Sequence, residues 1–358
     1  MSPRSAWAAK LGLVVAALVV VGIGLEILLR LWPTLLGYSF ANGALSRYTV
    51  RDGGIYYYDR SVRMNFMIPN HRATMFANGY VWHHETDVLG FRNATLHIPT
   101  DVVLLGDSLV YGHGMDFADT VGAQLERRSG LRVANLGRQG DCAYQEAYLL
   151  TTYIDVLKPR FVVYVFTPND IADLYVYLSD QAMEAFIAQP LDAIRYPPRT
   201  PPEIALRERA EKIRRQSVWK RVEEKSYVFK MGRWIQHRYR DAGPHAGIAV
   251  AEAAGRAALR VDTAIASTDP GSLGWRYTEH AIAYMDHLSR RRGARLLMIP
   301  ITSGRQLEIL LDIAARHGVH VVDTRRLVAT ADAFLPNDGH FSPAGARLAA
   351  ELIAERVR

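Results

Sequence analysis

The sequence predicts an α/β fold in which a central, parallel, five-stranded sheet lies between two layers of helices. Short and almost continuously apolar strands alternate with helical segments over residues 101–171 and again over 275–358. Strands of this kind are buried on both faces, and their alternation with helices is typical of parallel sheets. The length of 358 residues suits one large α/β domain with an elaboration, or two small domains.

Composition excludes several classes of protein. Hydrophobic residues make up 49% of the chain and charged residues 22%, which excludes general disorder and fibrous repeats. The single cysteine, Cys142, excludes an intramolecular disulfide framework and a cysteine-ligated zinc cluster. Residues 195–240 hold 14 Lys and Arg against five Asp and Glu, a net of +9 in a chain of net charge +7. The basic character therefore belongs to one segment.

The first element is an apolar helix predicted to anchor the chain in a membrane. Leu11 to Leu29 is a run of nineteen residues in which Glu26 is the only charge. At 1.5 Å per residue this run spans roughly 28 Å, about one hydrocarbon core. Trp7 and Trp32 flank it at a separation suited to the two membrane interfaces. We therefore expect residues 1–32 to form the anchor, with residues 11–31 in the membrane.

Charge favours an orientation with the N-terminus in the cytoplasm. Arg4 and Lys10 precede the apolar run, and the positive-inside rule places such residues on the cytoplasmic side. The expected location is therefore the inner (cytoplasmic) membrane, crossed once, with the rest of the chain periplasmic. A cleaved signal peptide is the alternative, but it usually has a shorter apolar core and a small-residue cleavage site. A buried core helix is disfavoured because the run has no polar face.

The following segments divide the rest of the chain. Residues 33–100 are rich in Tyr, Asn, Gly and His, and we expect an irregular lead-in with short strands. Residues 101–358 are predicted to be one domain, interrupted at about 172–272 by a basic helical insertion. Its five strands are expected at 101–105, 131–136, 160–166, 294–301 and 319–323. Its helices are expected at 120–128, 144–157, 275–292, 304–317 and from Pro343 onward.

Polar and glycine-containing segments follow three of these strands, and a fourth precedes the last helix. They are Gly106-Asp107-Ser108, Asn135 to Asp141, Thr167 to Asp170, and Pro336 to Pro343. Parallel sheets bind ligands at the carboxyl ends of their strands, so these segments are expected to meet. Taken singly, each has an ordinary interpretation as a glycine turn, an Asx turn, a helix cap or a surface Asp-Gly turn.

Together, the four segments resemble the SGNH hydrolases, the GDSL esterase/lipase family. The motifs read GDSLVYGHG, NLGRQG, TPND and DGHFSPAG, in the family's order. The apolar helix ending in Glu26-x-x-x-Arg30 and the LGFR segment at 89–92 are similar to its membrane-anchored bacterial branch. The resemblance implies the flavodoxin-like SGNH fold over residues 101–171 and 275–358.

The resemblance also implies the roles of six residues. Ser108 is expected to be the nucleophile, His340 the general base and Asp338 the group that orients His340. The oxyanion hole is expected from the Ser108 N–H, the Gly140 N–H and the Asn169 side-chain amide, with Asp107 in a supporting role. Much of the family has its acid three residues before the histidine, where this chain has Asn337. The catalytic aspartate is therefore expected one residue closer, at Asp338.

The residues and the resemblance together predict a serine esterase that hydrolyses O-acyl esters, foremost O-acetyl esters, at the cell envelope. An O-acyltransferase that moves an acetyl group to a cell-surface polysaccharide or exopolysaccharide is the alternative. A second alternative is a non-catalytic scaffold of an envelope acylation system. The expected partners are an acyl-ester or glycan substrate and a membrane acyltransferase, without nucleic acid. No cofactor and no metal are expected.

Two further features had competing interpretations. His113 follows Ser108 by five residues and could line the pocket, but a structural role behind the catalytic residues is favoured. The basic insertion carries aromatic residues among its charges. It is predicted to be a solvated helical face, an amphipathic surface against anionic lipid, or a groove for an acidic polysaccharide.

Overall fold

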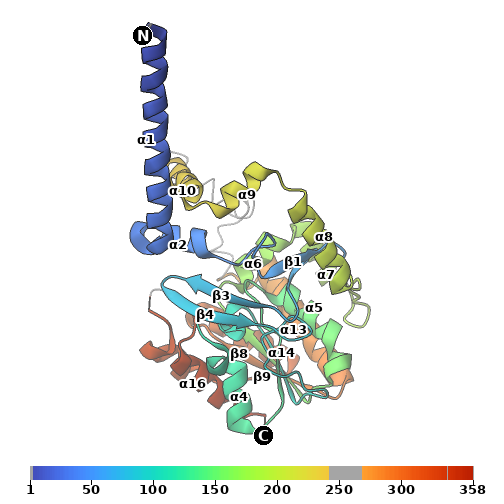
Figure 1. The fold of residues 1–358 in the computed structure, drawn as a ribbon. Helices are drawn as coiled ribbons and strands as arrows, with labels where there is room; N and C mark the ends of the chain where they lie inside the picture. Colours follow the sequence, from blue (N-terminus) through green and yellow to red (C-terminus); the bar gives the residue numbers. More distant parts are fainter. Residues whose placement is uncertain (1–2, 242–267, 337, 358) are drawn as a thin grey trace.

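The computed structural model describes residues 3–241, 268–336 and 338–357, which form an α/β domain from which one long N-terminal helix projects (Figure 1). Residues 242–267 of the predicted insertion and Asn337 lie outside this description. The elements agree with the expected order of strands and helices. Observed strands are one to three residues shorter than the expected runs, because hydrogen bonding to a neighbouring strand ends before the apolar residues do.

Five parallel strands form the central sheet, in the order β6-β5-β7-β8-β9. They are β5 (Val102–Leu105), β6 (Val133–Asn135), β7 (Phe161–Phe166), β8 (Arg295–Pro300) and β9 (His320–Val321). The chain moves first to one side of β5 and then to the other, so β5 and β7 are neighbours that lie on either side of a topological switch point. The loops that follow such strands diverge and leave a crevice at the carboxyl edge. The predicted five-stranded α/β/α fold is confirmed.

Helices cover both faces of the sheet, as the continuous burial of its strands requires. On β7, Val162 and Tyr164 belong to one hydrophobic cluster, and Val163 and Val165 belong to another on the opposite face. The first cluster is covered by α5 (Ala143–Leu157) and α13 (Leu273–Arg291), and the second by α4 (Val121–Ser129) and α16 (Pro343–Ala354). Helix α14 (Gly304–His317) also contributes to the first cluster. Short elements complete the domain: α3 (Ser108–Tyr111), η2 (Phe117–Asp119), α15 (Arg325–Ala329) and η4 (Ala331–Ala333).

The lead-in contains the expected short strands, which pair as two antiparallel hairpins. They pair β1 (Tyr56–Asp59) with β2 (Met64–Met67), and β3 (Arg72–Ala77) with β4 (Tyr80–Glu85). Phe66 and Trp82 are buried in the same hydrophobic cluster as one face of the sheet. The lead-in therefore shares the core of the domain.

The β3–β4 hairpin turns on two residues, Asn78 and Gly79. Their φ angles are +49° and +92°. Two consecutive positive φ angles define the tight turn that matches the twist of antiparallel strands, and Asn-Gly is its preferred sequence. The hairpin thereby holds Asn78 at its tip.

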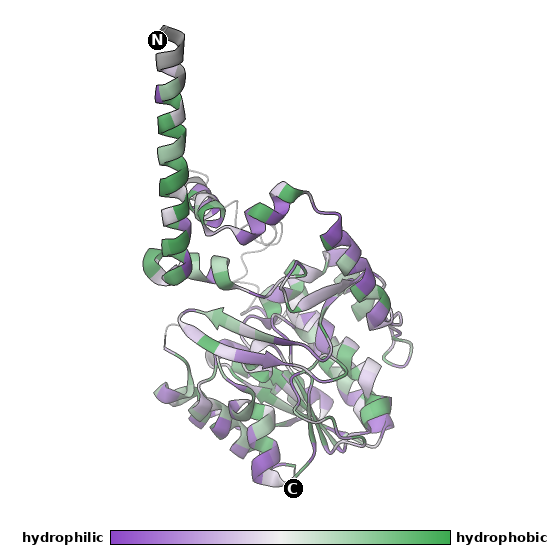
Figure 2. Ribbon diagram, in the orientation of Figure 1, coloured by the Kyte–Doolittle hydropathy of each residue, from purple (hydrophilic) through white to green (hydrophobic). Residues whose placement is uncertain are grey.

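The N-terminal helix α1 runs from Pro3 to Leu31, and η1 (Pro33–Leu36) and α2 (Tyr38–Leu45) follow it. Residues Ala9–Leu31 are long and apolar enough to cross a membrane, and none of the most apolar stretch is buried within the protein (Figure 2). Among the described residues, the end of α1 lies against η1, α2 and α10. There Leu29 and Phe40 are buried against Tyr227 and Trp234.

The described part of the insertion is mostly helical, with a non-helical stretch between Ile187 and Pro202. It consists of the end of α6 (Asp170–Tyr177), followed by α7 (Asp180–Ile187), α8 (Pro202–Arg214), α9 (Val218–Lys225) and α10 (Tyr227–Asp241). Helix α10 packs across the end of α1 and against α2 (Figure 1). The insertion therefore joins the sheet domain to the foot of the apolar helix.

Candidate active site

Ser108 lies at the carboxyl end of β5, where the chain turns sharply into α3. Asp107 caps this short helix, since its Oδ1 accepts a hydrogen bond from the Leu109 N–H at 2.9 Å. The residue before it must be small: a Cβ on Gly106 would lie 2.5 Å from the Val110 Cγ2. The Gly-Asp-Ser sequence therefore presents the serine hydroxyl at the end of the strand.

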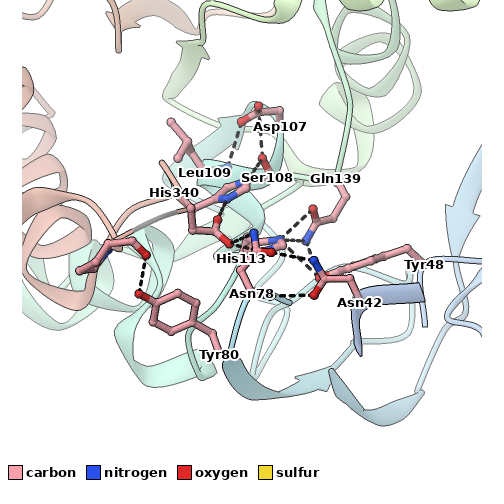
Figure 3. A network of polar contacts seen from close by, with 12 residues as sticks. Asn42, Tyr48, Asn78, Tyr80, Asp107, Ser108, Leu109, His113, Gln139 and His340 are labelled. Carbon is pink, nitrogen blue, oxygen red and sulfur yellow. Dashed lines mark hydrogen bonds and ion pairs between the residues drawn. The ribbon is translucent and has the colours of Figure 1, made fainter. Parts of the chain in front are cut away.

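His340 reaches Ser108 from the loop that precedes α16. Its Nε2 lies 2.7 Å from the Ser108 Oγ, and its Nδ1 contacts the Asp338 Oδ1 (Figure 3). Gly339, between the two, has a φ of +79°, and the Leu335 N–H donates to the His340 carbonyl at 2.7 Å. This turn brings the Asp338 carboxylate into contact with the His340 imidazole, although the two residues are separated in the sequence by Gly339 alone.

Electrostatics favours one protonation state for the three side chains. Burial raises the pKa of Asp338, but contacts with His113, His340 and Asn78 outweigh it and hold the pKa well below the usual range. An ionised carboxylate only accepts, so the Nδ1 of His340 carries the hydrogen and its Nε2 is free to accept from Ser108. Burial and the nearby His113 lower the pKa of His340 below 6.5, despite the opposing effect of Asp338. His340 is therefore a neutral base at pH 7.

Asp107 connects the ends of β5 and β7 beneath the serine. Its Oδ2 lies 3.4 Å from the Ser108 Oγ, 3.0 Å from the Thr167 hydroxyl and 3.5 Å from the Asn169 amide nitrogen. Asn169 is exposed, caps α6 and donates to Asp173 at 2.8 Å. Because the Ser108 hydroxyl and the Asn169 amide both contact the Asp107 Oδ2, the Asn169 amide lies beside the serine. Its role in an oxyanion hole remains a prediction.

Gly140 lies on the loop after β6, the strand on the other side of β5. Its φ is +71°, a conformation that other residues rarely adopt. The loop is anchored by a buried ion pair in which Arg138 donates to Asp141 at 2.8 Å, and by an Arg138 bond to the Asn65 carbonyl at 2.6 Å. The backbone that carries Gly140 is thus fixed against the β1–β2 hairpin. Its contribution to an oxyanion hole also remains a prediction.

Asn78 is a residue of the site that sequence reasoning missed. From the β3–β4 turn, its Nδ2 donates to the Asp338 Oδ2 at 2.8 Å. Asn42 of α2 holds the amide in place, because its Nδ2 donates to the Asn78 Oδ1 at 2.6 Å and its Oδ1 accepts from the Asn78 N–H at 2.8 Å. The Asn-Gly pair between alternating residues could have predicted the hairpin, but nothing in the sequence pairs it with Asp338.

His113 stands directly behind the catalytic histidine. The two rings stack with their centroids 3.9 Å apart, and the Nε2 of His113 lies 3.7 Å from the Asp338 Oδ2. On its other side, Gln139 and Tyr48 lie 2.9 Å and 3.4 Å from the His113 Nδ1. His113 is buried, so it belongs to the support of the site, as the favoured interpretation expected.

His113, Asp338 and His340 also carry potential metal-ligating atoms within 4.8 Å of one another. Both ring nitrogens of His340 already have partners, Ser108 on one side and Asp338 on the other. Metal binding would have to break one of these contacts. The arrangement therefore fits proton transfer to and from Ser108 better than metal ligation.

A family model matches the part of the chain that holds the last of the four motifs. Residues 279–358, which contain Asp338 and His340, match a family model described as "SGNH hydrolase-like domain, acetyltransferase AlgX". No curated protein sequence is significantly similar to the chain.

Solved structures cover more of the chain at low identity. One, described as the crystal structure of TesA, is 13% identical and covers 71% of this chain and 95% of its own, with a TM-score of 0.38. The lipase/acylhydrolase from Enterococcus faecalis is 15% identical and covers 72% and 95%, with a TM-score of 0.35. A catalytic mutant of an acetylxylan esterase from Geobacillus stearothermophilus is 13% identical and covers 73% and 94%, with a TM-score of 0.36.

Proposed function

Because this chain carries an SGNH hydrolase-like domain, we propose that it is a serine esterase that cleaves O-acyl esters through an acyl-enzyme on Ser108. The observation that carries the proposal is the 2.7 Å contact between the Ser108 Oγ and the His340 Nε2, with Asp338 on the other ring nitrogen. A serine hydroxyl is a poor nucleophile at neutral pH unless an adjacent base takes its proton.

In the first half-reaction, Ser108 attacks the ester carbonyl while His340 accepts the hydroxyl proton. The resulting imidazolium is stabilised by the ionised Asp338. Negative charge develops on the carbonyl oxygen, where the N–H groups of Ser108 and Gly140 and the amide of Asn169 are proposed to donate. One such donor is typically worth about 3 kcal/mol. His340 then returns its proton to the departing alcohol, which leaves an acyl group on Ser108.

In the second half-reaction, a hydroxyl group attacks the acyl-enzyme with His340 again acting as base. If the hydroxyl belongs to water, the enzyme is an esterase. If it belongs to a sugar, the enzyme is an O-acyltransferase. The description of the matched family, which names an acetyltransferase, favours this second candidate and supports acetyl as the acyl group.

The proposed location is the inner membrane, with the catalytic domain in the periplasm and a glycan of the cell envelope as substrate. Support comes from α1, whose residues Ala9–Leu31 are long and apolar enough to cross a bilayer. A membrane acyltransferase is a proposed partner of the transferase candidate, because an exported O-acyltransferase needs an acyl donor delivered to its side of the membrane.

Hydrolysis of a chromogenic acetate by the full-length protein, beside Ser108→Ala, tests the proposal. The alanine variant should lose about 10⁴-fold or more in kcat/KM. A burst followed by faster turnover with an added glycan would identify a transferase. Should both proteins be equally inert toward esters of several acyl lengths, with and without glycans, the scaffold alternative replaces the enzyme.

A further inference from the structure

A cavity of about 760 Å³ lies at the C-terminal end of α1, between α2, the loop 46–53 and α10. None of the catalytic side chains lines it. Cationic side chains from α1, the loop and the insertion surround it: Arg30, Arg47, Arg51, Lys225, Lys230 and Arg233. The basic residues of the insertion thus converge with those that follow the apolar helix.

Carboxylates balance only part of this charge. The Arg51 Nε lies 3.8 Å from the Glu224 Oε1. The Lys225 Nζ lies 3.5 Å from the Asp52 Oδ2. Arg233 pairs with Glu223 at 3.0 Å, and Arg30 pairs with Glu26 at 2.7 Å.

Lys230 and Arg47 make no ion pair with a carboxylate among the residues that the structure describes. The Nζ of Lys230 donates to the Ala44 carbonyl at 2.7 Å, and the Nη1 of Arg47 donates to the Gly53 carbonyl at 3.1 Å. Burial lowers the pKa of the Lys230 amine, and the positive charges of Arg30 and Arg47 lower it further. A bound anion would compensate this positive potential.

The position of the cavity indicates where such an anion would come from. The apolar stretch of α1 ends at Leu31, next to Arg30 on the cavity wall. A helix that crosses a bilayer reaches the lipid headgroups where its apolar stretch ends. On the neighbouring helix α9, Val218 and Trp219 are each 75% exposed, an apolar pair suited to the membrane interface.

We propose that this cavity binds the phosphate of an anionic lipid headgroup through Lys230 and Arg47. The proposal rests on the proposed membrane attachment of the chain and is independent of its chemistry at Ser108. It assigns one role to the insertion: the basic, aromatic segment forms a lipid site that holds the catalytic domain at the membrane surface. Guanidinium and ammonium groups together are a common phosphate-binding pair.

Binding of short-chain phosphatidylglycerol and phosphatidylcholine to the full-length protein in detergent, measured by native mass spectrometry, tests the site. We expect one phosphatidylglycerol to bind more tightly than phosphatidylcholine. Lys230→Met and Arg47→Gln should each weaken binding about fivefold, the value of one cation near a headgroup. Lys230→Arg keeps the charge and should bind as the unaltered protein does.

Lys212→Met is the matched control, since Lys212 is an exposed lysine on α8 that does not line the cavity. It should leave lipid binding unchanged. Thermal unfolding of each variant separates loss of the site from loss of the fold. Equal affinity for the two lipids, or equal losses from Lys212→Met and Lys230→Met, would overturn the proposal.

Competition distinguishes the lipid from the free ion. Displacement of phosphatidylglycerol by inorganic phosphate supports recognition of the phosphate group alone, whereas displacement only by glycerol 3-phosphate supports recognition of the whole headgroup. If neither competes, the phosphate site is wrong. Ser108→Ala should bind lipid normally, so failure of the esterase and failure of the lipid site are distinguishable.

Discussion

The carboxyl edge of the sheet and the β3–β4 hairpin contribute to the same candidate active site in different ways. The edge supplies Ser108 and Asn169 through loops that directly follow strands, and His340 on the loop before the last helix. The hairpin supplies Asn78, whose amide donates to the Asp338 Oδ2, whereas His340 contacts the Oδ1 of the same carboxylate. The sheet edge carries the side chains that are proposed to react. The hairpin holds the Asp338 carboxylate, which contacts His340.

A side chain can therefore lie close to Ser108 and His340 in space although nothing in its place along the sequence indicates this. Ser108 and His340 are 232 residues apart, and Asn78 and Asp338 are 260 apart. Both contacts depend on the fold. Only the first involves side chains whose motifs predict chemistry, whereas the second involves an ordinary turn asparagine. Substitutions in the two regions should therefore lower kcat by different factors.

The largest effect is expected at the sheet edge, from Asp338→Asn. An amide in place of the carboxylate cannot stabilise the imidazolium and favours the wrong tautomer of His340. We expect kcat on a chromogenic acetate to fall about 10⁴-fold, with KM changed little. Steady-state kinetics checks this, and a loss smaller than tenfold would mean that His340 is oriented by another group.

The pH profile should show a single acid limb from His340. Activity requires the neutral imidazole, so kcat/KM should fall about tenfold per pH unit below its pKa. Because the folded protein holds this pKa below 6.5, activity should persist at pH values where an ordinary histidine is already protonated. Asp338, with its pKa well below the usual range, should add no limb above it. An acid limb midpoint above 6.5 would contradict the assigned environment.

The hairpin is expected to have an intermediate effect, tested by Asn78→Ala. Loss of a hydrogen bond to a charged group costs about 1.5–3 kcal/mol, so kcat should fall about tenfold or somewhat more. Asn70→Ala is a matched control, because Asn70 has nearly the same positive φ, 50° against 49°, and precedes the same strand β3. Both variants carry the same backbone penalty. Equal losses of activity would show that the hairpin matters only for folding.

The smallest effect is expected from His113→Phe, which keeps a ring stacked on His340 but removes the nitrogen near Asp338. We expect a loss of about threefold in kcat. Since His113 lowers the pKa of His340, its removal should move the acid limb to higher pH. A merely structural role would change stability without moving the limb. The pH profile of the variant, measured beside its thermal unfolding, separates these cases.

Much of the fold and the centre of the site could be predicted because they depend on local signals. The apolar strands at 101–105, 131–136 and 160–166 alternate with helices at regular intervals, which indicates a parallel sheet. Gly106 and Gly339 mark the turns that present Ser108 and His340. The lead-in contains the expected short strands, but their pairing into two hairpins was not predicted, although Asn78-Gly79 is a turn signal.

Local patterns in the sequence predicted which residues could react and where the strands and helices of the sheet domain lie. They also indicated that one apolar segment is long enough to cross a membrane. The polar side chains that hold Asp338 in place became evident only from the packing of distant segments. Asn42 and Asn78 contact each other and Asp338 because α2 and the hairpin pack together beside the sheet edge. In the basic insertion, packing likewise brings Lys225 close to Asp52, whereas Lys230 donates to the Ala44 carbonyl and pairs with no carboxylate of the described residues. Periodicity and turn chemistry act over a few residues, whereas these contacts depend on how distant segments pack.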